Sequence, residues 1–169
     1  MANINMEFRA KVISTGEWVY GYYLYISEKD EHYILTGKIK SYPVDFAHPY
    51  LVTKGFESIL VDGSTVSMCT RLWSCGKKIF EGDILRIFTS VENKNRDPYD
   101  IYGNEPWSVK REDYAIVERD LVTSGFRLKV YHNGKYKRIA KFDTGHLSVY
   151  NAEIVGNIWD NKELIGAKK

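Results

Sequence analysis

Cysteine and proline are scarce in this chain of 169 residues, and long apolar runs are missing. The two cysteines, Cys69 and Cys75, fit neither a C-x-x-C spacing nor an even disulfide framework. The opening residues, MANINMEFRA, lack the apolar core of a signal peptide. No apolar run approaches the roughly 18 residues that a membrane-spanning helix needs. We therefore expect a cytoplasmic protein with reduced thiols and no membrane partner.

Sequence motifs for catalysis and for metal binding are missing as well. The chain has no glycine-rich phosphate loop, no Ser-His-Asp order and no zinc-ligand spacing. Five acids occur between residues 97 and 113, but without the order of an EF-hand, so a solvated loop is expected there: Asp97, Asp100, Glu105, Glu112 and Asp113. The net charge of +2 gives no argument for nucleic-acid binding by itself. We predict no metal and no cofactor.

Aromatic residues are abundant, at 14% of the chain with 13 tyrosines, and they favour β-structure. Apolar and charged residues alternate over residues 6–14, and residues 17–27 form a second segment rich in aromatics. Similar short segments follow along the chain, whereas no long amphipathic helix is found. The sequence thus predicts a mainly β fold, with antiparallel strands in a small barrel or sandwich-like body and at most short helical turns.

The predicted strands fall into two groups. Residues 1–60 read as N-terminal β-hairpins, and residues 61–169 read as a C-terminal, β-barrel-like part. Residues 92–113 are polar and contain two prolines, so they are predicted to form a mobile loop inserted into the second group. The two groups together are expected to form one compact unit.

A tight turn is predicted within residues 76–85, GKKIFEGDIL. Gly82 permits a positive φ angle, and the Asp83 carboxylate can hold the corner by accepting backbone N–H bonds. The alternative is that Glu81 and Asp83 form a catalytic carboxylate pair, since side chains two apart on a strand lie about 6–7 Å from each other. No other feature indicates a sugar-binding cleft, so the turn is favoured.

A second hairpin is predicted over residues 125–141, because Asn133-Gly134 joins two alternating segments. With a two-residue turn, Lys129 would face Arg138 across the ladder. Basic and aromatic side chains interleave on this hairpin, a pattern that suits phosphate binding and base stacking: Arg127, Lys129, Tyr131, Lys135, Tyr136, Lys137, Arg138 and Lys141. The alternative is a solvated edge, neutralised by acids such as Glu118 or Asp120.

Two tryptophans are candidates for a protein interface. Trp73 lies beside Cys75 in a predicted turn, and Trp107 lies in the predicted loop. Exposed tryptophans often anchor protein interfaces. The alternative is that both rings fold back onto the body of the protein.

Several segments, in order along the chain, resemble the YopX family of proteins encoded by bacteriophages and prophages. They include VYGYYLY at 19–25, VDGSTVSMCTRL at 61–72, GKKIFEGDIL at 76–85 and EIVGNIWDNKELI at 153–165. The last two are similar to the family's G-K-x-I-Y-E-G-D-I-V and E-V-I-G-N-I-Y-E-N-P-E-L-L. The chain departs from the family pattern at Gly63, at Arg71 and at Trp73-Ser74-Cys75.

This resemblance implies a mostly β fold and a phage or prophage origin, and it supplies no catalytic residues. We therefore expect a non-catalytic binding protein in the cytoplasm of a bacterial host, acting on a host or phage protein or on nucleic acid. A second copy of the chain is a further candidate partner, as a homo-oligomer. The alternative function is a small hydrolase or nuclease that uses Glu81, Asp83 and histidines among His32, His48, His132 and His146.

Overall fold

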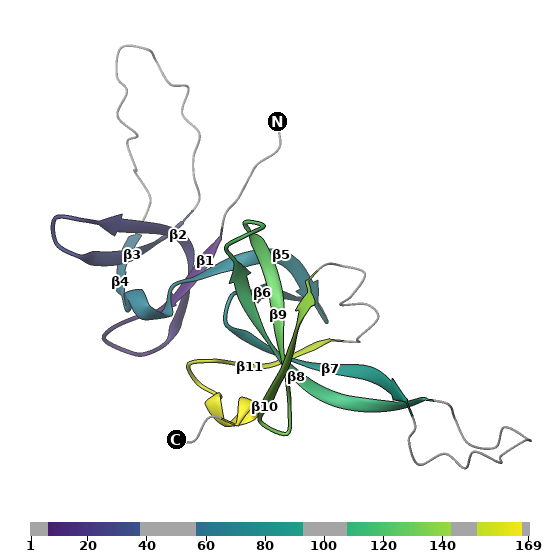
Figure 1. Ribbon diagram of the computed structural model, residues 1–169. Helices are drawn as coiled ribbons and strands as arrows, with labels where there is room; N and C mark the ends of the chain where they lie inside the picture. The colour runs from purple at the N-terminus through teal and green to yellow at the C-terminus, as the bar shows by residue number, and fades with distance from the viewer. Residues whose placement is uncertain (1–6, 38–56, 93–107, 143–151, 167–169) are drawn as a thin grey trace, which may run out of the picture. The chain divides into compact units, whose positions relative to one another are not determined.

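The computed structural model describes residues 7–37, 57–92, 108–142 and 152–166 (Figure 1). These residues are mainly β, as predicted, and their strands pair in antiparallel sheets. Helical structure within the described ranges is limited to two short 3-10 turns, η1 (Gly63–Thr65) and η2 (Lys162–Ile165). The chain divides into two compact units, Met1–Cys69 and Thr70–Lys169, whereas the predicted groups met at residues 60 and 61.

The first unit is a small sheet built from β1 (Phe8–Lys11), β2 (Trp18–Ile26), β3 (Glu31–Thr36), β4 (Glu57–Val61) and the start of β5 (Ser67–Ser74). Its strands follow the order β4-β3-β2-β1-β5. An antiparallel bridge between Val12 and Val61 also links the chain after β1 to the end of β4. One face of the sheet is buried and contains the core residues Ala10, Ile34 and Val61.

The second unit contains a five-stranded sheet in the order β10-β9-β8-β7-β11. Its strands are β7 (Asp83–Glu92), β8 (Ser108–Asp120), β9 (Gly125–His132), β10 (Lys135–Lys141) and β11 (Glu153–Asn157), preceded by β6 (Lys77–Phe80), which neighbours β5. Apolar side chains fill the core on one side of the sheet: Ile79, Leu85, Ile87, Ala115, Val117, Leu128, Val130 and Ala152. Among the described strands β10 and β11 lie at the edges, so this sheet is not closed into a barrel, and of the two predicted forms the sandwich-like one is confirmed.

The sequence predicted a loop over residues 92–113, and both of these limits are wrong. Strand β7 includes Glu92, and β8 begins at Ser108, with these two residues paired across the ladder. Polar composition misled the prediction, because backbone pairing with β7 holds Lys110-Arg111-Glu112-Asp113 in the sheet despite their polar side chains. Residues 93–107, including Trp107, Asp97, Asp100 and Glu105, lie outside the described residues.

Candidate functional site

The predicted hairpin over residues 125–141 is confirmed as β9 and β10. Asn133 and Gly134 form its turn with φ angles of +48° and +71°, as a two-residue hairpin turn requires. The predicted cross-strand register is wrong, however. A bulge between Tyr136 and Arg138 shifts the pairing, so that Lys129 lies opposite Ile139 and Arg138 lies opposite Val130. The extra residue removes the like-charge contact that the predicted register would have created.

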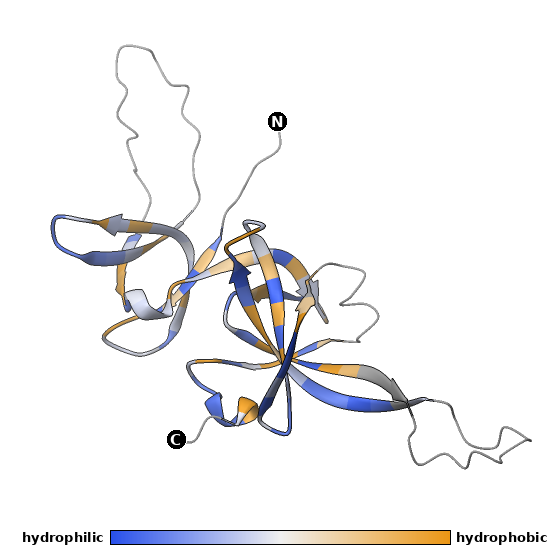
Figure 2. Cartoon of the chain, viewed as in Figure 1, coloured by the Kyte–Doolittle hydropathy of each residue, from blue (hydrophilic) through white to orange (hydrophobic). Residues whose placement is uncertain are grey.

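This bulge also divides the basic residues of the hairpin between the two faces of the sheet. Arg127 and Lys129 alternate with the buried Leu128 and Val130, so they lie on the face away from the core, and Figure 2 shows the resulting alternation along β9. Arg138 pairs with Val130 and therefore belongs to the opposite face. The structure thus brings together no single face that carries all the cations of the hairpin.

A carboxylate already engages two of these cations. Glu118 of β8 lies 3.5 Å from the Arg127 guanidinium and 3.4 Å from the Lys129 ammonium. The negative charge of Glu118 is the main reason why the pKa of Lys129 is raised, with Tyr131 as a further cause. The Tyr131 and Tyr136 rings pack edge-to-face, with their centroids 6.2 Å apart. The arrangement matches the alternative of a charged edge neutralised by a neighbouring strand.

The predicted turn at Glu81, Gly82 and Asp83 has the expected geometry. Gly82 has a φ angle of +80°. The buried Asp83 carboxylate accepts the backbone N–H of Phe80 at 2.8 Å, and thereby holds the corner between β6 and β7. Glu81 instead contacts Arg119, at 3.4 Å on the exposed surface. The two carboxylates therefore occupy different environments: Asp83 is buried within the turn, whereas Glu81 lies at the surface.

Trp73 is exposed over 58% of its surface, near the end of β5. The Lys78 ammonium of β6 lies 5.7 Å from the centre of its ring, a cation–π contact that holds the ring on the hairpin surface. Cys75 is exposed in the intervening turn. Trp73 thus remains available to a partner, while Trp107 lies outside the described residues.

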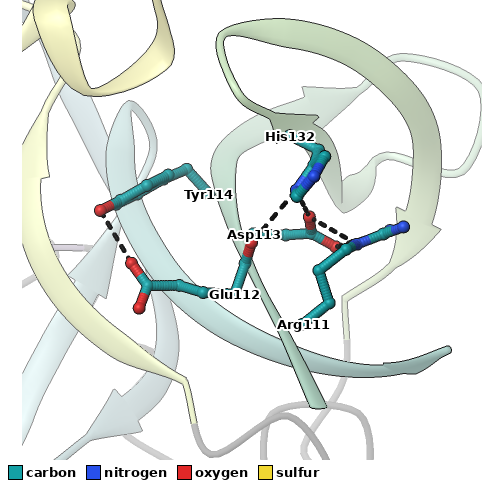
Figure 3. A network of polar contacts seen from close by, with 5 residues as sticks. All are labelled: Arg111, Glu112, Asp113, Tyr114 and His132. Carbon is teal, nitrogen blue, oxygen red and sulfur yellow. Dashed lines mark hydrogen bonds and ion pairs between the residues drawn. The ribbon is translucent and has the colours of Figure 1, made fainter. Parts of the chain in front are cut away.

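A buried polar network, which the sequence did not reveal, joins β8 to β9 (Figure 3). The Asp113 side chain is fully buried. It forms an ion pair with Arg111 of the same strand, whose Nη2 atom lies 3.0 Å from the Asp113 Oδ2 atom. The Nδ1 atom of His132 lies 2.8 Å from the other carboxylate oxygen of Asp113. Glu112 and Tyr114 point away from Asp113, and the Tyr114 hydroxyl donates to Glu112 at 3.0 Å, which raises the pKa of Tyr114.

A carboxylate on Nδ1 of a histidine is also the arrangement that orients a catalytic base. Here Asp113 is shared with an arginine, so its charge is already compensated, as in a structural ion pair. Within the ranges that the structure describes, no group of three or more His, Cys, Asp or Glu side chains is placed to hold a metal ion. The network therefore fits a role in fixing β8 against β9 better than a role in catalysis.

The outer face of the first unit carries a group of aromatic and aliphatic side chains. Seven residues on the side opposite the core define this aromatic face: Trp18, Tyr20, Tyr22, Leu24, Tyr33, Leu35 and Leu60. Cross-strand pairs align them in rows, because Leu24 lies opposite Tyr33, which lies opposite Leu60. A second row pairs Tyr22 with Leu35.

Three members of the aromatic face are partly exposed: Tyr20 at 48%, Leu24 at 40% and Leu60 at 39%. The face is bordered on β1 by two cations, since the Arg9 guanidinium lies 4.6 Å from the centre of the Trp18 ring and the Lys11 ammonium lies 5.5 Å from it. These contacts hold the Trp18 ring in a defined orientation. Clustered exposed apolar side chains on a sheet typify an interaction surface, whereas scattered ones need no explanation.

The two units differ in charge. Residues 1–69 contain eight acidic and six basic side chains, whereas residues 70–169 contain 14 acidic and 18 basic side chains. The unit that carries the aromatic face is therefore net negative. A net negative charge disfavours a polyanion and favours a partner with basic residues.

No protein-family model matches this chain, and no curated protein is significantly similar to it. Within the described residues, no helix has the length and the apolar character needed to cross a membrane.

Proposed function

We propose that this chain is a non-catalytic binding protein that engages a polypeptide partner through the aromatic face of its first unit. The observation that carries the proposal is the pair of cross-strand rows formed by Tyr22 with Leu35 and by Leu24, Tyr33 and Leu60. Tyrosine and tryptophan are enriched at protein interfaces because they combine a large apolar area with a polar group. An ordered row of such side chains offers contact area at a low entropic cost.

A protein partner has more support than a nucleic acid. Stacking of bases on aromatic side chains normally accompanies a positively charged groove along the backbone. The first unit is net negative, and the basic hairpin of the second unit is divided between two faces and paired in part with Glu118. A polypeptide with basic and apolar side chains matches the net charge of the first unit better.

The resemblance to the YopX family adds the biological setting to this proposal. We place the protein in the cytoplasm of a bacterium that carries the phage or prophage, with a host or phage protein as its partner. A hydrolase or nuclease has less support, because the buried Asp83 carboxylate is used within its own turn.

Affinity capture from a nuclease-treated lysate of such a bacterium tests this function. The double variant Tyr20→Ser/Leu24→Ser removes two exposed members of the aromatic face. It should abolish capture of a specific protein, and it should lower the unfolding free energy by only about 1–2 kcal/mol, because both side chains are about half exposed.

A matched control is the double variant Leu121→Ser/Val122→Ser, which removes two aliphatic side chains that are 86% and 90% exposed in the second unit. This control should capture the same protein as the unmodified chain. Equal capture by the variant of the aromatic face, or loss of capture only in the control, would show that the aromatic face is not the interface.

A further inference from the structure

A groove of about 670 Å³ opens in the first unit, between the chain after β1, the start of β3 and the end of β4. We call it the Asp62 groove. It is lined by carboxylates, by a histidine ring and by aliphatic side chains, so it combines three kinds of surface. Glu31 and Leu60 line this groove, and they lie respectively beside and within the aromatic face, so the two features are continuous.

Three carboxylates line the groove, from Asp30, Glu31 and Asp62, against the single ammonium group of Lys11. One oxygen of Asp62 is fixed by Ser64, which donates its backbone N–H at 2.9 Å and its hydroxyl at 2.7 Å. The hydrogen bonds from Ser64 are the main reason why the pKa of Asp62 is lowered. Asp62 is therefore ionised at neutral pH and held in one orientation.

The His32 ring forms a rigid planar part of the groove. Its Nδ1 atom is 2.6 Å from the Tyr23 hydroxyl, and the Tyr25 ring stacks against it with centroids 4.8 Å apart. Gly63 packs on the same ring so closely that a β-carbon at this position would lie 2.3 Å from it. The ring therefore cannot swing away on that side without moving the backbone.

The remaining lining includes the aliphatic side chains of Ile13 and Leu60, which are both exposed. Such side chains can cover the alkyl stem of a long basic residue while its charged end reaches a carboxylate. Of the two basic side chains, arginine fits better, because a planar guanidinium can bond to carboxylates in a fork.

We propose that the Asp62 groove binds an arginine side chain of the polypeptide that docks on the aromatic face. This inference rests on the proposed function, because it specifies the chemistry of that partner. The guanidinium would pair with the Asp62 carboxylate, with its stem against Ile13 and Leu60. The groove would then select a partner that presents arginine beside an apolar segment.

Titration of the full chain with acetyl-Gly-Arg-Gly-amide, followed by NMR of the backbone amides, tests the groove without the natural partner. The peptide should shift the amides of Asp62, Gly63 and Ser64 at millimolar concentrations. The same peptide with citrulline, which has the shape of arginine without its charge, should bind about ten-fold more weakly or worse.

Asp62→Asn keeps the oxygen that accepts from Ser64 but removes the charge, and it should weaken arginine binding by a similar factor. Glu57→Gln is the matched control, because Glu57 is an exposed acid of β4 outside the groove, and it should leave binding unchanged. Equal binding of the citrulline peptide, or an unchanged affinity in Asp62→Asn, would overturn the inference.

The two proposals can fail separately. If the arginine peptide shifts no groove amide while capture still depends on Tyr20 and Leu24, only the inference about the groove is lost. If the peptide binds but the Tyr20→Ser/Leu24→Ser variant captures the same protein as the unmodified chain, the proposed function is wrong instead.

Discussion

The ring of Trp159 packs directly on Gly82, so that a β-carbon at position 82 would lie 2.4 Å from two ring carbons. The backbone of Gly82 is engaged as well, since its N–H donates to Val117 at 2.8 Å and its carbonyl accepts from Ile158 at 2.9 Å. The turn between β6 and β7 is thus a packing site for β8 and for the chain after β11.

Replacement of Gly82 by alanine should destabilise the second unit by roughly 2–4 kcal/mol. About 1 kcal/mol comes from the positive φ angle and the rest from displacing the Trp159 ring. Gly76→Ala is the control, because Gly76 has a φ angle of +77° but no atom within 4 Å of the added carbon. In urea denaturation, this control should lose about 1 kcal/mol of unfolding free energy relative to the unmodified chain. Equal losses in the two variants would contradict the role of Trp159.

Asp113→Asn should destabilise the protein by about 2–3 kcal/mol, because it leaves Arg111 without its counter-charge and removes the carboxylate that contacts Nδ1 of His132. The loss is smaller than for a fully enclosed pair, since the Arg111 and His132 side chains are 34% and 27% exposed. Glu112→Gln, one residue away on the other face, should change the unfolding free energy by less than about 0.5 kcal/mol. Similar values for the two variants in urea denaturation would show that the network adds no stability.

The turn after β8 should make stability depend on pH through Asp120. The Thr123 hydroxyl and the Val122 amide donate to this carboxylate and lower its pKa below its ordinary value. A lowered pKa adds stability above the unfolded pKa, and this stability is lost as the pH falls through the folded pKa. The unfolding free energies of the unmodified chain and of Asp120→Asn should therefore converge between about pH 5 and pH 2. A difference that stays constant over this range would contradict the expected coupling.

The basic hairpin should not bind nucleic acid at physiological salt, because Glu118 already pairs with Arg127 and Lys129. Fluorescence anisotropy with a labelled single strand and a labelled duplex should show no rise at micromolar protein. Binding to the duplex with a log–log salt slope near −3.6, as expected for about four phosphates, would reverse this conclusion. Loss of that binding on charge reversal of Lys129, Lys137 and Arg138 would then assign it to the hairpin.

Local patterns in the sequence predicted the turns and most of the strands. The turns at Asn133-Gly134 and at Gly82 could be predicted, because each turn needs a positive φ angle that few residues adopt without strain. The bulge at Lys137 could not be predicted, since a one-residue shift in register leaves the sequence alternation of the flanking residues almost intact. That shift decides which cations share a face.

The candidate surfaces could not be predicted, because they depend on which strands pair and which face of each sheet is buried. Residues 108–113 are polar, so no apolar alternation marked them as a strand, and the burial of Asp113 becomes apparent only when β9 lies beside β8. The segment YGYYLY places aromatics on both faces of β2. Its composition therefore predicted a strand but could not show which side would be buried.

The contact between Gly134 and Gly166 sets an order for folding during synthesis. A β-carbon on Gly166 would lie 2.5 Å from the α-carbon of Gly134, so the turn that follows η2 is seated on the tip of the β9–β10 hairpin. The hairpin cannot acquire this contact until residue 166 has left the ribosome, whereas β1 to β4 and the start of β5 all precede residue 70. The strand pairing of the first unit can therefore form while the second unit is still being made.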